Sequence, residues 1–460
     1  MPSKRPQASG RHCQSGWATS STGRSASPPF PTTWHRWRRS SRPGSAPSDL
    51  VLPHLRNRGG KGDRRWQDDG PVKYVICVPD GCADLPVPEL DGRTSLEAAD
   101  TPHLDALAAR ATVGRAAVIP EGLPPGSDVG NMSILGFDPT RHHTGRAPIE
   151  AAAQGIGLRP DQTAFRCNLV TVVDGVMADY AGGNPPSDAA AEVIAEIDRA
   201  LGGGRDGLSF HPGLSFRHTL VAPAGWIDAD CIPPHDLSDD PVVLPAGPAG
   251  PRLRDLMEAS RDILAASELE ATQIWLWGQG LAPNVPSFRD THGVSAGLVT
   301  AVDLVRGLGI LTGMKVCDIP GATGWYDTDY EGKRDIALEE LDRGLDLFVV
   351  HVEATDEAGH SGHVADKVEA LENWDRRILA DLVPGLDAMG PWRLLMLPDH
   401  ATPLTTRTHT SDPVPYLLVD SEVDGAGGVF TEAGVADAPI VAGHMLVPRL
   451  LAGHGAPPSA

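Results

Sequence analysis

The sequence predicts an α/β fold, in which helices cover both faces of a mostly parallel sheet and an α+β segment is inserted. Two short apolar runs, residues 345–352 and 392–397, are bounded by turn residues, as is typical of buried strands in a parallel sheet. Residues 145–285 differ, because short strand patterns alternate there with helical ones. At 460 residues the chain is also too long for one ordinary core, which favours at least two domains.

The N-terminal part of the predicted core, residues 73–136, contains a strand, a helix and a loop with a candidate serine. A buried strand is expected at residues 73–81, running into Asp80, and a helix at residues 101–110, with threonine as its cap and proline at its first position. In the loop at residues 120–136, two prolines and a glycine precede Ser127. The residues that follow this serine can start a helix, and the free N–H groups at the helix N-terminus would favour binding of an anion. Taken alone, the serine is better interpreted as a simple helix cap.

The inserted segment is expected to begin with a hairpin. Residues 165–177 hold two apolar segments around an Asp-Gly turn. A helix follows at residues 187–201, and residues 214–221 alternate like a half-buried strand. Strand-helix units then return at residues 293–309, with a further helix at residues 333–341. This order predicts an α+β module within an outer α/β domain.

Composition excludes several classes of function. The formal net charge of −21 argues against nucleic acid as a general partner. Six cysteines without a C-x-x-C spacing indicate free thiols in a reducing cytoplasm. Since no apolar stretch approaches the roughly 18 residues that span a bilayer, no membrane association is expected.

The first 70 residues differ in charge from the rest. They hold 13 Lys or Arg against 4 Asp or Glu, and they lack sustained apolar periodicity. This composition predicts a disordered basic extension. Its cluster at residues 34–39 could contact RNA or anionic lipid, but an inert tail or a misplaced start codon is the simpler interpretation.

Side chains of the types that bind metals follow the two strands predicted in the C-terminal part of the chain. Three predicted turns marked by glycine or proline, at residues 355–363, 398–402 and 408–413, supply Asp356, His360, Asp399, His400 and His409. Open α/β sheets place their chemistry at the carboxyl ends of strands. Oxygen and imidazole donors suit Mn²⁺, Zn²⁺ or Mg²⁺. Each residue alone could be a helix cap or a solvated loop residue, but the five together predict a metal site.

Asp80 and Ser127 extend this set to seven donors, which is enough for two metal ions. In a two-metal site one ion lowers the pKa of a bound hydroxyl, and both stabilise the oxygens of a transferring phosphoryl group. A metal-bound serine would then be an alkoxide nucleophile that could form a phosphoserine.

Five motifs in a fixed order carry a family resemblance. They are P-D-G (79–81), G-S-D-V-G-N-M-S-I-L-G-F-D-P (126–139), R-A-P-I-E-A-A (146–152), A-T-D-E-A-G-H (354–360) and P-D-H-A-T-P (398–403). Their order resembles the archaeal-type branch of cofactor-independent phosphoglycerate mutases, in the alkaline phosphatase superfamily. The resemblance covers roughly residues 72–455 and implies an alkaline-phosphatase-like sheet with an inserted substrate-binding lid. The implied segments are an extension (1–70), a metal-binding core in two parts (71–144 and 286–460) and the lid domain (145–285).

The resemblance also implies roles for the seven donors. Ser127 would be the phosphorylated nucleophile. One metal would be held by Asp80, Ser127, Asp399 and His400, and the other by Asp356, His360 and His409. The expected cofactors are two divalent metal ions, with Mn²⁺ as the first choice and Mg²⁺, Zn²⁺ or Co²⁺ as alternatives.

Substrate contacts are implied in the same way. In the family, a lysine that contacts the phosphate precedes the D-E-A-G-H motif. Lys333 occupies the corresponding position here. Arginines of the insertion would hold the carboxylate and phosphate of a small phosphorylated substrate, because guanidinium groups bind both anions in a bidentate manner. The candidates are Arg146, Arg166 and Arg217, with Asp179 and His235 as weaker candidates for acid–base or substrate contacts. A lid hinged near residues 145 and 285 would exclude water from the phosphoserine.

The resulting expectation is a phosphoglycerate mutase of glycolysis and gluconeogenesis, interconverting 3-phosphoglycerate and 2-phosphoglycerate. A phosphatase, another phosphomutase or a small-alcohol kinase, such as a homoserine kinase, is the alternative within the same chemistry. A non-catalytic metal-binding or scaffold protein is the alternative outside it. The oligomeric state is left open.

Overall fold

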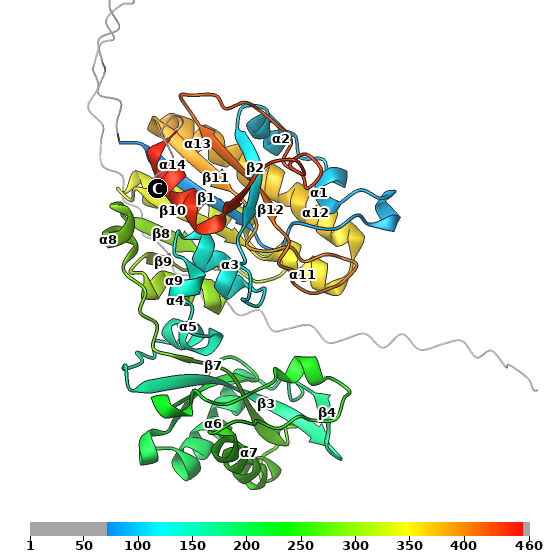
Figure 1. Cartoon of the computed structure of the whole chain (residues 1–460), viewed down its shortest axis with the longest axis vertical. Coiled ribbons are helices and arrows are strands. Elements are labelled where there is room, and N and C mark those ends of the chain that lie inside the picture. The colour runs from blue at the N-terminus through cyan, green and yellow to red at the C-terminus, as the bar shows by residue number, and fades with distance from the viewer. Residues whose placement is uncertain (1–70, 454–460) are drawn as a thin grey trace, which may run out of the picture. The chain divides into compact units, whose positions relative to one another are not determined.

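The computed structural model describes residues 71–453, and the predicted basic extension at residues 1–70 lies outside this range. Within it, the strands form an eight-stranded sheet and a five-stranded sheet (Figure 1). Between residues 71 and 453 no helix combines the length and the apolar character needed to cross a membrane.

Five neighbouring strands of the large sheet run parallel. Their order is β11 (Trp392–Met396), β1 (Lys73–Pro79), β10 (Leu347–Val352), β8 (Ala296–Val299) and β9 (Lys315–Cys317). Beyond β11 the order is β12 (Val414–Asp420), β2 (Thr112–Ala117) and β13 (Ile440–Ala442), with β12 antiparallel to both neighbours. The three strands predicted at residues 73–81, 345–352 and 392–397 are therefore confirmed, and they lie side by side.

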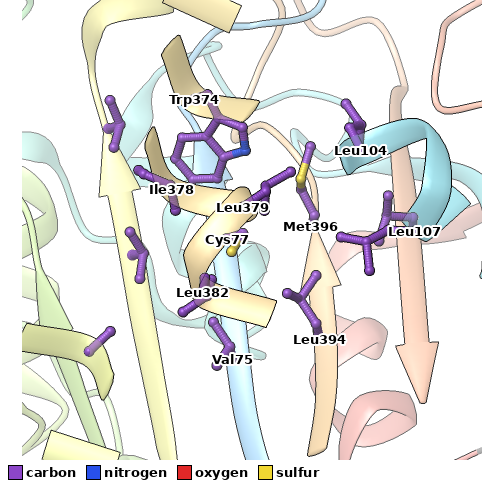
Figure 2. Close-up of a cluster of buried hydrophobic side chains, with 14 of the residues drawn as sticks. Val75, Cys77, Leu104, Leu107, Trp374, Ile378, Leu379, Leu382, Leu394 and Met396 are labelled. Carbon is purple, nitrogen blue, oxygen red and sulfur yellow. The ribbon is translucent and has the colours of Figure 1, made fainter. Parts of the chain in front are cut away.

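Helices cover both faces of the large sheet, as predicted. In β1, Val75 and Cys77 belong to one buried cluster, whereas Ile76 and Val78 belong to a second one on the opposite face. The first cluster includes residues of α1 (Ser95–Ala98), α2 (Pro102–Ala108), α10 (Tyr330–Asp342), α12 (Val364–Trp374), the π-helical turn η5 (Asp375–Leu379) and α13 (Ala380–Met389). Figure 2 shows Trp374 of this cluster packed near β1. The second cluster includes residues of α3 (Ser127–Ile134), α5 (Arg146–Ala153), α8 (Phe288–His292), α9 (Asp303–Leu311) and α14 (Leu446–Ala452).

The small sheet is antiparallel throughout. Its order is β4 (Val176–Asp179), β3 (Gln162–Val173), β6 (Arg217–Pro223) and β5 (Ser209–His211), and β7 (Gln273–Leu281) also pairs with β3 outside this order. Helices α6 (Ser187–Leu201) and α7 (Gly250–Ala265) contribute to its apolar core. The predicted hairpin is confirmed, because Asp174 and Gly175 join β3 to β4 with φ angles of 50° and 79°. The predicted helix at residues 187–201 is α6.

One strand prediction in the insertion is wrong in detail. The strand expected over residues 214–221 begins only at Arg217, after a turn in which Ser215 has a φ of 51°. It is also buried over residues 218–222 rather than half-buried. Two of its buried polar side chains have hydrogen-bond partners, because Thr219 donates to Gln154 Oε1 and His218 Nδ1 accepts from the N–H of Gly213.

The insertion joins the large-sheet part near the predicted hinge. The small sheet spans residues 162–281, and α5 contacts both α9 and β7. Thr144 Oγ1 donates to Leu281 O at 2.8 Å, so the two connections lie against each other. Domain boundaries at residues 145 and 285 stay predictions. The remaining short elements are η1 (Pro88–Leu90), α4 (Pro139–His142), η2 (Arg205–Gly207), η3 (Ala224–Trp226), η4 (Pro234–Leu237), α11 (Ala354–Ser361) and η6 (Gly443–Met445).

Candidate metal centre

The polar residues converge at the carboxyl ends of three adjacent parallel strands. Asp80 follows β1, Asp399 and His400 follow β11, and α11 follows β10. The backbone N–H of Asp80 donates to Val352 O at 2.9 Å, which fixes it against the end of β10. This is the edge at which open α/β sheets collect their functional groups.

One part of the prediction requires correction, because the stretch at residues 355–363 is mostly helical rather than a turn. Helix α11 covers Ala354–Ser361, and Asp356 and His360 are four residues apart on it. That spacing places both side chains on the same helix face.

Asp356, His360 and His409 form the first candidate cluster. The Nε2 atoms of the two histidines are 2.9 Å apart, and they lie 3.3 Å and 3.5 Å from the Asp356 carboxylate oxygens. Burial opposes a charge on His360, but its hydrogen bond to Asp356 and that carboxylate's charge raise its pKa to about 9. His360 Nδ1 lies 3.1 Å from the carbonyl of Arg407, which directs Nε2 toward the cluster. A metal ion could take the place of the shared proton.

The second candidate cluster contains the predicted nucleophile. His400 Nε2 lies 3.2 Å from Ser127 Oγ, 3.6 Å from Asp80 Oδ1 and 3.5 Å from Asp399 Oδ2. Burial lowers the pKa of His400 to about 4, so its ring is neutral at pH 7. Its Nδ1 lies 3.1 Å from the Thr402 hydroxyl, whose own hydrogen goes to Asp356. His400 therefore carries its hydrogen on Nδ1. The lone pair on its Nε2 faces the serine hydroxyl and the carboxylates.

Buried negative charge makes the two clusters suitable for cations. Asp80, Asp356 and Asp399 are all buried, and Asp80 Oδ1 has no hydrogen-bond partner. Burial and the neighbouring carboxylates Asp399 and Asp356 raise the pKa of Asp80 well above its usual value. Uncompensated buried carboxylates are costly, whereas a bound divalent ion would neutralise them. Oxygen and imidazole donors at this density fit a divalent metal.

The serine is held by the first turn of α3. Ser127 is the first residue of this helix and is 8% exposed, which confirms the predicted helix N-terminus. Asn131 Nδ2 donates both to Ser127 O at 3.0 Å and to Asp399 Oδ2 at 2.7 Å. The helix that carries the serine is thus hydrogen-bonded directly to a metal-ligand candidate.

Gly130 allows α3 to approach the loop after β11. A Cβ added there would lie 1.9 Å from the carbonyl oxygen of Asp399, so one of the two segments would have to move. Substitution Gly130→Ala is expected to lower the free energy of unfolding by about 1–3 kcal/mol through overpacking. It should also weaken Mn²⁺ binding by displacing Asp399. Denaturant unfolding and isothermal titration calorimetry measure both effects.

Gly225→Ala provides the matched control, because a Cβ at Gly225 would meet no atom within 4 Å. This variant should retain the stability and metal affinity of the parent protein. Equal stability losses in the two variants would contradict the steric explanation.

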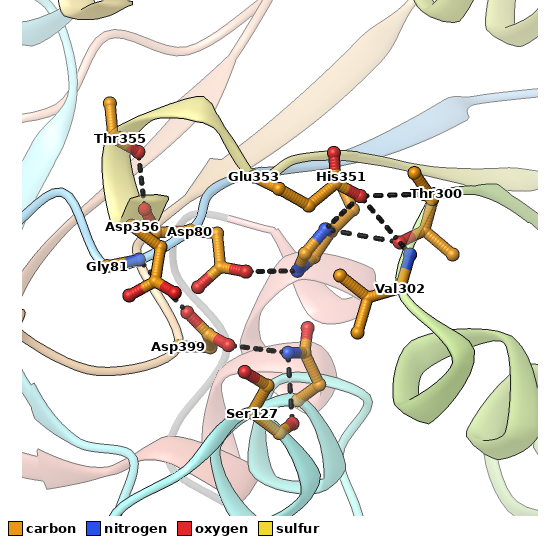
Figure 3. A network of polar contacts seen from close by, with 12 residues as sticks. Asp80, Gly81, Ser127, Thr300, Val302, His351, Glu353, Thr355, Asp356 and Asp399 are labelled. Atoms are coloured by element: carbon orange, nitrogen blue, oxygen red, sulfur yellow. Dashed lines mark hydrogen bonds and ion pairs between the residues drawn. The ribbon is translucent and has the colours of Figure 1, made fainter. Parts of the chain in front are cut away.

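Sequence reasoning missed His351 and Glu353. His351 lies within β10, with its Nδ1 3.2 Å from Glu353 Oε1 and its Nε2 3.5 Å from Asp80 Oδ2 (Figure 3). The available signal was a histidine in an otherwise apolar run, two residues before a glutamate. Burial opposes ionisation of Glu353, but Lys333 and His351 hold its pKa well below the usual range.

Lys333 lies beside this pair. Its Nζ donates to Glu353 Oε2 at 2.5 Å and to His351 O at 2.9 Å, and its side chain is fully buried. The geometry therefore gives Lys333 a structural partner on the protein. Its direct contact with a phosphate stays a prediction.

The arginine candidates of the insertion form an interacting group. Arg166 and Arg146 both pair with Glu150, at 2.8 Å and 3.5 Å, and the Arg166 guanidinium lies 4.3 Å from the Trp277 ring centre. Burial lowers the pKa of Arg166 to about 10, and the positive charges of Arg146 and Arg217 contribute to this shift. Arg146 and Arg217 thus both lie close enough to Arg166 to affect its pKa.

The two weaker candidates have different surroundings. Asp179 accepts hydrogen bonds from the backbone of Ala181 and Gly183, at 2.8 Å and 2.7 Å, so it stabilises a turn. The ring of His235 lies 5.3 Å from that of Trp277, which places His235 beside the aromatic residue that supports Arg166.

Comparisons with known proteins agree on one family. Residues 108–270 match the family described as 2,3-bisphosphoglycerate-independent phosphoglycerate mutase. The chain is 44% identical over 365 residues to a protein of that name from Methanothrix thermoacetophila, covering 76% of this chain and 92% of the relative. A probable enzyme of the same name from Geobacter sulfurreducens is 41% identical, with coverage of 78% and 93%. Among solved structures, the cofactor-independent phosphoglycerate mutase of Thermoplasma acidophilum is 25% identical with a TM-score of 0.56, covering 83% of this chain and 99% of that one.

Proposed function

Because the chain belongs to the 2,3-bisphosphoglycerate-independent phosphoglycerate mutase family, we propose that it interconverts 3-phosphoglycerate and 2-phosphoglycerate through a phosphoserine at Ser127. The observation that carries this proposal is the position of the serine. Its Oγ lies 3.2 Å from the neutral ring of His400, beside buried carboxylates that suit a divalent metal. No other serine hydroxyl in residues 71–453 is hydrogen-bonded to one of the seven predicted donors.

The two clusters would hold two metal ions, with Mn²⁺ as the first choice. Asp80, Asp399, His400 and Ser127 would hold one, and Asp356, His360 and His409 the other. A bound divalent ion lowers the pKa of a hydroxyl and stabilises negative charge on phosphoryl oxygens. The protein itself supplies the orientation: Asn131 holds Asp399, and the first turn of α3 directs its N–H groups toward an anion at Ser127.

The arginines of the insertion would bind the rest of the substrate. Arg166 is held in place by Glu150 and by the ring of Trp277, so little conformational entropy is lost when it binds an anion. Arg146 and Arg217 would supply the remaining positive charge for a carboxylate and a phosphate. By excluding water, the insertion would keep the phosphoserine from hydrolysis while the glycerate turns.

Turnover of 3-phosphoglycerate tests the proposal. The purified full-length protein, loaded with Mn²⁺, should form 2-phosphoglycerate in an assay coupled to enolase, without accumulation of inorganic phosphate. Removal of metal with a chelator should abolish turnover, and added Mn²⁺ should restore it. Metal-loaded protein that forms no 2-phosphoglycerate with Mn²⁺, Mg²⁺, Zn²⁺ or Co²⁺ would contradict the proposal. Release of inorganic phosphate would instead identify a phosphatase.

A further inference from the structure

His351 is a fully buried histidine near the carboxyl end of β10, an inner strand of the large sheet. Strand β10 lies between β1 and β8, and the His351 side chain has no solvent-exposed surface. Its Nε2 lies 3.5 Å from Asp80 Oδ2 but has no hydrogen-bond partner. Ligand atoms of His351, Asp80 and Asp399 all lie within 4.8 Å of one another. Two carboxylates and one imidazole therefore lie close enough together to hold one metal ion.

The other ring nitrogen determines which tautomer is present. His351 Nδ1 contacts Glu353 Oε1 at 3.2 Å and Thr300 Oγ1 at 3.3 Å. The Thr300 hydroxyl donates to Glu353 at 2.9 Å, so it has no second hydrogen to offer the ring. The glutamate also pairs with Lys333, which keeps it an acceptor. Nδ1 must therefore carry a hydrogen, which Glu353 accepts, and in the tautomer with a single ring hydrogen Nε2 carries a lone pair.

A lone pair on Nε2 faces the carboxylate of Asp80. This arrangement is repulsive unless a cation lies between the two groups. A histidine that donates its far N–H to a carboxylate is also the usual arrangement for a metal-bound imidazole, because the carboxylate fixes the ring and strengthens its basicity.

We infer that His351 is a further metal ligand, which binds the cation shared by Asp80 and Asp399 while Glu353 fixes its ring. The inference rests on the proposed function, because it requires a metal at Asp80 and Asp399. It adds an imidazole from the second-last residue of β10 to a ligand set that otherwise follows the strand ends. Lys333 and Glu353 are then positioning residues for this ligand.

Metal binding by a His351→Asn variant tests the inference. Asparagine keeps an N–H group that can donate to Glu353, but it lacks a nitrogen in the place of Nε2. Titration of the metal-free full chain with Mn²⁺ should show an affinity at one site lowered by about 100-fold or more. Pulsed electron paramagnetic resonance of the Mn²⁺-loaded protein should also show one fewer histidine nitrogen bound to manganese.

His218→Asn is the matched control. His218 is also buried and also has an unpartnered Nε2, but it lies in β6 and pairs with no carboxylate. This variant should retain the parental Mn²⁺ affinity and nitrogen signals. If His351→Asn does not fold, Glu353→Gln serves in its place, and loss of the ring's fixed tautomer should weaken binding by roughly 10- to 100-fold.

The outcomes separate the inference from the proposed function. Parental protein that binds no Mn²⁺ would overturn both. Parental protein that binds Mn²⁺, together with a folded His351→Asn variant of equal affinity and unchanged nitrogen signals, would overturn the inference alone. In that case a proton rather than a metal ion occupies the space between His351 and Asp80.

Discussion

Replacement of Ser127 by alanine is expected to lower the turnover of 3-phosphoglycerate by roughly 10⁴-fold or more, the usual cost of removing a catalytic nucleophile. The hydroxyl lies 3.2 Å from His400 Nε2 and is the proposed acceptor of the phosphoryl group. Alanine removes that acceptor but leaves the buried carboxylates and histidines in place. The variant should therefore remain folded, bind metal and fail to take up label from 3-phosphoglycerate radiolabelled in its phosphate.

Ser133→Ala is the control on the same helix. Ser133 is also a buried serine of α3, but its hydroxyl donates to the carbonyl of Val118 at 2.6 Å, away from the metal centre. Its loss should cost about 1 kcal/mol of stability and leave turnover and phosphate labelling intact. Retained turnover in Ser127→Ala, or labelling of that variant to the parental level, would rule out the phosphoserine mechanism at this position.

The ligand candidates that could be predicted from the sequence are those that directly follow an apolar run. Asp80, Asp399 and His400 each follow a strand that is recognisable by its composition alone, and parallel strands bring such ends together. His351 could not be found in this way, because it lies inside the apolar run of β10 and its importance depends on the neighbouring strand. Ligands within a strand carry no local signal beyond an unexpected polar residue.

The misassigned stretch at residues 355–363 has a different cause. Two glycines suggested a turn, but only Gly362 ends the helix, with a φ of 70° that is typical of a helix C-terminus. Gly359 lies inside α11, where an added Cβ would be 2.5 Å from the carbonyl oxygen of Thr402. That glycine is needed for close packing against the loop after β11, which propensity rules cannot anticipate. The partner of Lys333 was equally hidden, since Glu353 lies 20 residues further along the chain.

Replacement of Lys333 by methionine is expected to lower the free energy of unfolding by about 3–5 kcal/mol, because it leaves the Glu353 carboxylate buried without its cation. The double variant Lys333→Met/Glu353→Gln removes both charges and should recover most of this loss. Denaturant unfolding of metal-free protein measures the two values. As a control, Lys315→Met breaks a pair with Glu340 in which the lysine is 53% exposed, and it should cost only about 0–1 kcal/mol. Similar losses for both single variants would contradict the buried-charge explanation.

The same double variant distinguishes the two roles of Lys333. If the lysine only neutralises Glu353, removing both charges should restore stability. Assayed at a saturating Mn²⁺ concentration, which offsets the weaker metal binding expected of Glu353→Gln, the double variant should then keep a KM for 3-phosphoglycerate close to the parental value. If Lys333 also contacts the phosphate, the double variant should regain stability while its KM stays raised. The burial of Lys333 and its two hydrogen bonds to β10 and Glu353 lead us to expect the first result. A raised KM in a fully stable double variant would instead support the phosphate contact that the family resemblance implies.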